Sequence, residues 1–241
     1  MNFFANQYVR TFAIAAAAFV FVSAAGAVRA DGQILKEILD RMDGNYRTLT
    51  TVRANITMKK TDPNTGTSDT YVGVVNAIPE RKKQKGQKDQ KLYARIDWSK
   101  PKEVLLAVDR KYWLYRPALN QVLTGSSDTA KKNAGAGNVL SFMSATSKAQ
   151  LQAEYDVKYA GQETIAGGLQ VWHIELTPKT KKSYTVADMW VDPDGFPRQV
   201  RIQENSGDIV EILLTKVEKN PTIDAKIFST AEFKGAKVIQ G

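Results

Sequence analysis

The first residue that could do chemistry is His173, the only histidine in the chain. It stands between Trp172 and Ile174 in a segment that alternates apolar and polar side chains, which is typical of a β-strand. A serine hydrolase could use no other general base, and no nucleophile motif lies near it. We therefore expect His173 to be a structural residue on a sheet face. A hydrolase that uses His173 or a pair of carboxylates is kept as a hypothesis, but it ranks third, behind two non-enzymatic functions.

Two short motifs could hold a metal ion or a phosphate, and both fail in their spacing. Asp192, Asp194 and Gly195 match the start of a calcium loop, but no glutamate follows at the twelfth position, which favours a simple turn. Residues 135–137, Gly-Ala-Gly, lack the third glycine of a dinucleotide loop. With no cysteine and one histidine, thiolate metal sites are excluded and histidine-rich ones are not expected. We expect a protein that is not an enzyme and has no cofactor and no metal.

The strongest charge feature is a basic run at residues 80–91 that holds six lysines and arginines. It is open to three interpretations: a solvated loop, a contact with anionic lipid headgroups, or a nucleic-acid site. The last is the weakest because aromatic residues do not interleave with the cations. We single out Arg81, Lys82 and Lys83 as contacts to a headgroup or partner, and we expect no nucleic acid as a partner.

The chain has 241 residues, 43% of them hydrophobic, and a formal charge of +9. That length suits one large domain. Residues 1–30 have the layout of a secretory signal peptide, with an apolar run at 11–22 and Val28-Arg29-Ala30 before Asp31. An uncleaved membrane anchor is the alternative, although the apolar run is shorter than a bilayer requires. We predict an exported protein whose single domain spans residues 31–241.

The periodicity of the mature chain indicates an α+β fold. Residues 31–43 have the apolar stripe of a helix, and Gly44 is the predicted stop. The period then changes from 3.6 to 2, and nine to eleven short strands follow, joined by turns. A second helix is predicted from Asn138 towards Leu151. Hairpin-linked strands are antiparallel, so we expect one large curved antiparallel sheet with helices packed on one face.

Several motifs, in this order, resemble the periplasmic outer-membrane lipoprotein carrier (LolA-like) family, which sorts lipoproteins. They are Leu-Tyr-Ala-Arg-Ile-Asp-Trp-Ser-Lys-Pro at 92–101, Tyr-Trp-Leu-Tyr-Arg-Pro at 112–117, Ile-Glu-Leu-Thr-Pro at 174–178 and Met-Trp-Val-Asp at 189–192. The resemblance covers nearly the whole mature chain. One departure concerns the lid: Ile78-Pro79 stands where many members have Arg-Pro, the arginine that tethers the lid.

The resemblance implies an unclosed half-barrel whose helices form a lid on the concave face. It implies a non-enzymatic carrier that takes acylated lipoproteins from an inner-membrane ATP-driven transporter to an outer-membrane acceptor, with transient contact to an anionic membrane surface. A carrier of another envelope lipid, or a sensor or adaptor domain of the same fold, is the alternative. The residues that we expect to line the lipid-binding groove share apolar strand faces or the internal helix: Ile56, Met58, Ile96, Trp98, Leu114, Phe142, Met143, Trp172, Ile174 and Leu176.

Overall fold

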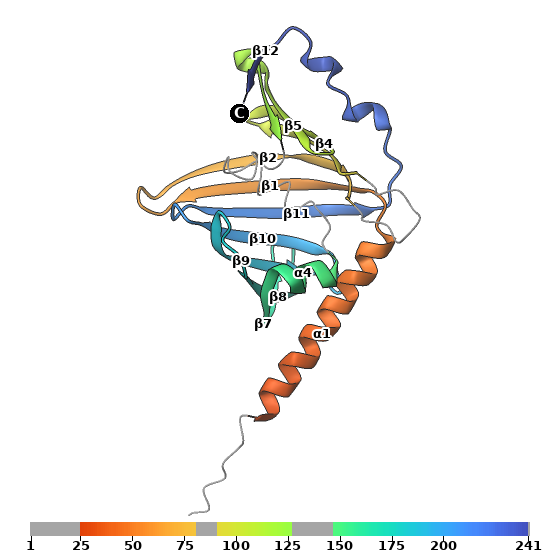
Figure 1. The fold of residues 1–241 in the computed structure, drawn as a ribbon, viewed down its shortest axis with the longest axis vertical. Helices are drawn as coiled ribbons and strands as arrows, with labels where there is room; N and C mark the ends of the chain where they lie inside the picture. The colour runs from red at the N-terminus through yellow and green to blue at the C-terminus, as the bar shows by residue number, and fades with distance from the viewer. Residues whose placement is uncertain (1–24, 81–90, 127–146, 241) are drawn as a thin grey trace, which may run out of the picture.

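The computed structural model describes residues 25–80, 91–126 and 147–240 (Figure 1). Its first half contains α1 (Ala25–Thr48), β1 (Val52–Asp62), β2 (Thr67–Ile78), β3 (Tyr93–Lys100), β4 (Lys102–Val108), β5 (Lys111–Arg116), the 3-10 turn η1 (Pro117–Leu119) and β6 (Gln121–Ser126). Its second half contains α4 (Lys148–Glu154), β7 (Tyr155–Ile165), β8 (Leu169–Pro178), β9 (Tyr184–Val191), β10 (Pro197–Glu204), β11 (Ile209–Lys219), η2 (Ala225–Phe228), η3 (Ala231–Phe233) and β12 (Lys237–Gln240).

All the described strands form one sheet, in the order β12-β6-β5-β4-β3-β2-β1-β11-β10-β9-β8-β7. Neighbours are antiparallel except β12, which runs parallel to β6. Because β12 and β7 stand at opposite ends of this order, the sheet curves without closing. The predicted fold class, an open antiparallel half-barrel with helices, is confirmed. The described residues form twelve strands, one more than the upper end of the predicted nine to eleven. The parallel strand β12 follows no hairpin turn, so no turn signal in the sequence indicated it.

Strand alternation builds the two faces of the sheet. In β1 the side chains of Val52, Ala54, Ile56 and Met58 are buried, and those between them are half-buried. Antiparallel pairing continues this face across the sheet, because Met58 opposes Tyr71 on one side and Ile212 on the other. The buried side chains of this face, together with apolar residues of α1 and α4, form the main core cluster. We call it the concave face.

Helix α1 is longer than predicted at both ends, and Gly44 does not end it. The helix continues because its last turns have tertiary contacts: Asn45 Nδ2 donates to the Gly195 carbonyl at 3.2 Å, and Leu49, just after the helix, is buried. At its other end, α1 runs through the predicted cleavage site before Asp31. Of the predicted internal helix, residues 138–146 lie outside the described residues. The described part, α4, begins after the capping residue Ser147.

The outer face of β3–β6 is covered by the C-terminal segment, residues 220–240, which crosses it before pairing as β12 (Figure 1). Phe228 and Phe233 pack there with Leu106 and Val122 in a second, smaller cluster. Arg95 of β3 fixes this segment, because its guanidinium contacts the Ile227 carbonyl at 3.1 Å and the Glu232 carboxylate at 2.5 Å. The C-terminal segment therefore covers the outer face of this half of the sheet.

Candidate functional site

The concave face gathers the groove residues that the sequence predicted. Six of them are buried members of its main cluster, and Leu114 and Trp172 pack against that cluster. Phe142 and Met143 lie outside the described residues, as do Arg81, Lys82 and Lys83. The eight that the structure describes come from four strands and share one face: Ile56, Met58, Ile96, Trp98, Leu114, Trp172, Ile174 and Leu176.

Helix α1 lies against the β7–β10 half of this face (Figure 1). It places Ile38, Leu39 and Met42 in the cluster, all below a tenth exposed. The β9–β10 turn meets the helix directly, because a β-carbon at Gly195 would overlap the backbone of Arg41. No sequence pattern indicates this contact, because Arg41 and Gly195 are far apart in the chain. It shows that α1 is seated on the sheet by backbone contact as well as by apolar side chains.

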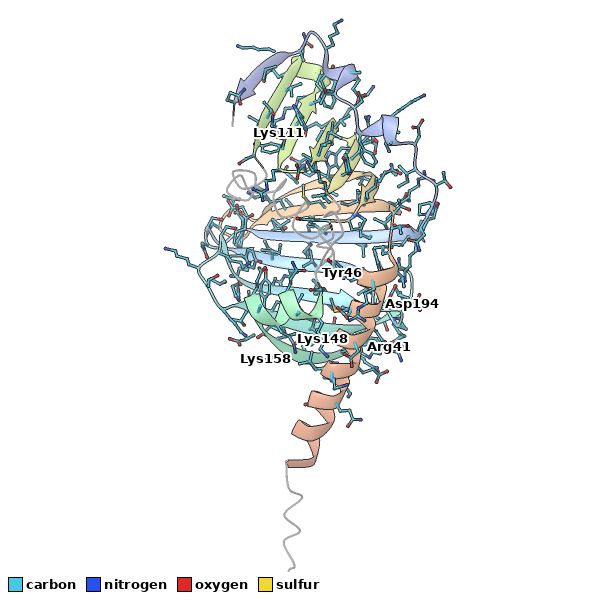
Figure 2. All side chains as sticks on the ribbon, turned by 45° about the vertical axis from the view of Figure 1, so that its right-hand side comes forward. Arg41, Tyr46, Lys111, Lys148, Lys158 and Asp194 are labelled. Atoms are coloured by element: carbon cyan, nitrogen blue, oxygen red, sulfur yellow. The ribbon has the colours of Figure 1, made fainter. Side chains whose placement is uncertain are left out.

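Polar contacts hold α1 at the edge of the sheet. The guanidinium of Arg41 donates to the Pro193 carbonyl at 2.7 Å and lies 5.2 Å from the Trp172 ring centroid. Figure 2 shows Arg41 beside Asp194, with Lys148 of α4 next to the same helix. The predicted turn at 192–195 is confirmed: Asp192 Oδ1 accepts the backbone N–H of Asp194 at 3.0 Å.

Asp40 joins the two helices. Its carboxylate accepts from Lys148 Nζ at 2.5 Å and from Lys36 Nζ at 2.9 Å. The hydrogen bond from Lys148, with that from Lys36, lowers the pKa of Asp40 to about 2. The backbone N–H of Lys148 also donates to Asp43 at 3.3 Å. Helix α4 is thus fixed to α1, and both helices contact the β7 end of the sheet.

One end of the concave face carries a line of polar and aromatic side chains that the sequence analysis did not identify. We call it the rim. Met58 and Ile212 lie just inside it. Opposed pairs mark its course, since Glu204 faces Tyr184 and Trp98 faces Glu103. Its members, in order across the sheet, are Tyr155, Tyr184, Glu204, Lys60, Tyr71, Trp98, Glu103 and Arg116.

Direct contacts connect the rim along its length. The Tyr155 and Tyr184 hydroxyls are 2.5 Å apart, and burial, followed by this hydrogen bond, raises the pKa of Tyr184. The Tyr71 and Trp98 rings meet edge to face at 5.7 Å. Burial raises the pKa of Tyr71, and the nearby Glu103 carboxylate acts in the same direction. The ring bodies therefore belong to the apolar cluster, while their polar ends lie at its margin.

The end of the concave face opposite the rim is made of small side chains. Val52 opposes Ala77, Ala77 opposes Ala94, and Ala94 opposes Ala107, so four strands contribute to one row. Each of these residues is at most 2% exposed. Alternation along β1 and β3 predicted the apolar side of Val52 and Ala94. Only the register of the sheet places its members side by side.

His173 lies on the opposite face, away from the concave cluster. Its ring stacks on Trp190 with centroids 4.6 Å apart, and its Nδ1 and Nε2 atoms are 2.7 Å from Glu163 and 3.0 Å from Asp188. The indole N–H of Trp190 donates to the same Glu163 at 2.8 Å. Each nitrogen of the His173 ring thus contacts a carboxylate. The network ties β7, β8 and β9 together, as the structural role expected of His173 requires.

The described residues offer no metal site and no membrane span. Within residues 25–80, 91–126 and 147–240, no three His, Cys, Asp or Glu side chains converge as metal ligands. In the same ranges no helix combines the length and the apolar character needed to cross a bilayer. The arrangement is an apolar face under two helices with a polar margin, which suits binding.

Comparison with known proteins gives one family and several solved structures. A family model described as "-like: Uncharacterized protein" matches residues 99–223. No curated protein matches the chain. An uncharacterized conserved protein from Thermus thermophilus has 14% sequence identity and a TM-score of 0.52, with 87% of this chain and all of that chain (100%) covered.

Two further solved structures bear the family name that the sequence motifs resemble. An outer membrane lipoprotein-sorting protein domain from Vibrio parahaemolyticus has 17% identity and a TM-score of 0.44, covering 85% of this chain and 98% of its own. A LolA superfamily protein from Nitrosomonas europaea has 14% identity and a TM-score of 0.41, with 80% of this chain and 96% of that chain covered. At such identities a likeness concerns the fold alone, and of these three only the Thermus structure exceeds a TM-score of 0.5.

Proposed function

The chain belongs to the family of uncharacterized proteins whose model matches just over half of it, and we propose that it is a periplasmic carrier that binds acyl chains on its concave face. In this proposal it moves acylated lipoproteins from an inner-membrane ATP-driven transporter to an outer-membrane acceptor, and it catalyses no reaction. The signal-peptide layout of residues 1–30 and the motif resemblance support the compartment and the cargo. The alternative cargo is another envelope lipid.

The observation that carries the proposal is the gathering of the predicted groove residues. Eight apolar side chains, chosen from the sequence, lie on one face and belong to or pack against one apolar cluster, to which α1 and α4 also contribute. A sixteen-carbon chain costs about 12 kcal/mol to expose to water, at about 0.8 kcal/mol per CH₂, so a carrier must enclose it. Ile56, Ile96 and Ile174 are fully buried here. The acyl chain would therefore replace contacts between the helices and the sheet.

The test is to identify what the protein binds. Native mass spectrometry of protein purified from the periplasm should show bound lipid or lipoprotein, and the purified protein should take up a fluorescent fatty acid. A clean apo mass together with no uptake would contradict the carrier function. A stable protein partner without lipid would favour the sensor or adaptor hypothesis.

Two matched variants locate the site. Leu114→Gln places an amide on the concave face at a half-buried position, where folding should survive. Val74→Gln makes the same kind of change on the outer face, where the side chain is 38% exposed. We expect about tenfold weaker uptake for Leu114→Gln, since a polar group must be desolvated against the acyl chain. Equal uptake by both variants would place the acyl site elsewhere.

A further inference from the structure

The rim differs chemically from the rest of the concave face in a way that gives a bound chain a direction. Lys60 is the last inward residue of β1 at the rim, and Val52 is the first at the other end. Between them Met58, Ile56 and Ala54 are buried and apolar. An amphiphile gains most when its tail lies along this apolar floor and its head lies where tyrosine and tryptophan meet water. We call the row of small side chains at Val52, Ala77, Ala94 and Ala107 the alanine row. A tail that runs from the rim towards the alanine row would therefore be buried along its length.

The charges of the rim are matched in pairs. Lys60 Nζ lies 2.7 Å from Asp208, and Arg116 Nε lies 3.2 Å from Glu103. The hydrogen bond to Asp208 raises the pKa of Lys60, and the charge of Glu204, a third carboxylate that is 9% exposed, acts in the same direction. Among the described side chains of this region, three carboxylates thus lie near two cations, so these side chains alone offer no surplus positive charge to an anionic head.

Hydrogen-bonding capacity is nevertheless left over. The Arg116–Glu103 contact lacks hydrogen-bond geometry, and the buried Nε of Arg116 has no hydrogen-bond partner in the described part of the chain. The Tyr71 hydroxyl, half-buried beside it, makes none with another described residue. Ester, amide and hydroxyl oxygens accept such donors without adding a charge.

We propose that the rim is the mouth of the groove, where an uncharged, ester- or amide-linked head of an acyl amphiphile rests while its chain runs inward along β1 towards Val52. This inference rests on the carrier function proposed above and adds the direction of binding and the head that is selected. Lys60, Tyr71, Glu103 and Arg116 contact the head, and Trp98 lies beside the first carbons of the chain.

Direction is tested with two neutral quenchers, the methyl esters of 5-doxyl- and 16-doxyl-stearate. The 5-doxyl ester should quench tryptophan fluorescence more strongly than the 16-doxyl ester. That difference should fall in Trp98→Phe, in which Trp172 is the tryptophan left on the concave face, and persist in Trp113→Phe, since Trp113 packs in the outer cluster. Equal or stronger quenching by the 16-doxyl ester would overturn the direction. If neither ester binds, the carrier function itself fails, so the two outcomes are distinguishable.

Head selection is tested by competition between monopalmitoylglycerol and palmitate, which share a chain and differ in head charge. The wild type should bind the glycerol ester more tightly. Glu103→Gln frees Arg116 and should improve palmitate binding about fivefold, whereas the control Glu211→Gln removes an equal charge from the outer face and should not. Tighter palmitate binding by the wild type, or an equal response of both variants, would overturn the proposed head selection.

Discussion

Gly195→Ala is the sharpest test of how α1 is held on the sheet. Gly195 closes the β9–β10 turn with φ +81, and its N–H donates to the Asp192 carbonyl at 2.8 Å. An added methyl group would meet backbone atoms of Arg41 and Met42, which cannot rotate away as a side chain can. The helix or the turn must therefore move. The bond from Asn45 to the Gly195 carbonyl, 3.2 Å long, would weaken with it.

Two contributions set the magnitude. A left-handed conformation costs an ordinary residue about 1–2 kcal/mol, and overpacking of a tight contact typically costs about 1–3 kcal/mol more. Gly195→Ala should thus lower the free energy of unfolding by about 2–5 kcal/mol. Gly207→Ala is the matched control: its φ is +95 in the β10–β11 turn, and nothing lies within 4 Å of the added β-carbon. Gly207→Ala should lower the free energy of unfolding only by the cost of the left-handed conformation, about 1–2 kcal/mol.

The assay is equilibrium unfolding in urea, followed by far-UV circular dichroism, for the wild type and both variants. Gly195→Ala should have the lower midpoint, and its uptake of fluorescent fatty acid should change because α1 covers the concave face. Equal losses of stability in the two variants would refute the reasoning, since the contact with α1 would then add nothing to the cost of the turn.

Two further perturbations follow from the structure. Arg95→Met removes the clamp on the C-terminal segment and should lower the free energy of unfolding by about 2 kcal/mol, while Arg201→Met, an exposed control 4.0 Å from its partner, should cost less than about 1 kcal/mol in urea unfolding. Asp40 has a folded pKa of about 2 against an ordinary value of 3.8, so its contribution is complete above pH 4 and is lost as pH falls towards 2. Asp40→Asn should therefore be less stable than the wild type at pH 7, and the gap in thermal midpoint should close by pH 2; a gap that does not narrow would contradict the Asp40 link between the helices.

Much of the fold was predictable because strand alternation is local. The pattern from Val52 to Met58 identified one apolar face, and the same pattern in β3 and β8 identified its continuation. The turn at 192–195 was predicted from its aspartates, proline and glycine.

The errors have a common cause. Gly44 was expected to end a helix, yet contacts with Gly195, far along the chain, extend α1 past it. The weak helix propensity of one glycine, about 1 kcal/mol, is outweighed by packing of the following turn. Strand β12 lacked a hairpin signal because its partner, β6, is distant in sequence and parallel to it.

By itself the sequence determined which side chains share a face within each strand, since a period of two depends only on neighbouring residues. Only the tertiary structure decided how these faces align. The register between β1 and β11 opposes Met58 to Ile212, and the register between β3 and β4 opposes Trp98 to Glu103. A shift of one residue would turn every side chain of a strand to the other face. Packing of the apolar residues on both faces fixes that register, and with it the rim, the row of small side chains and the direction between them.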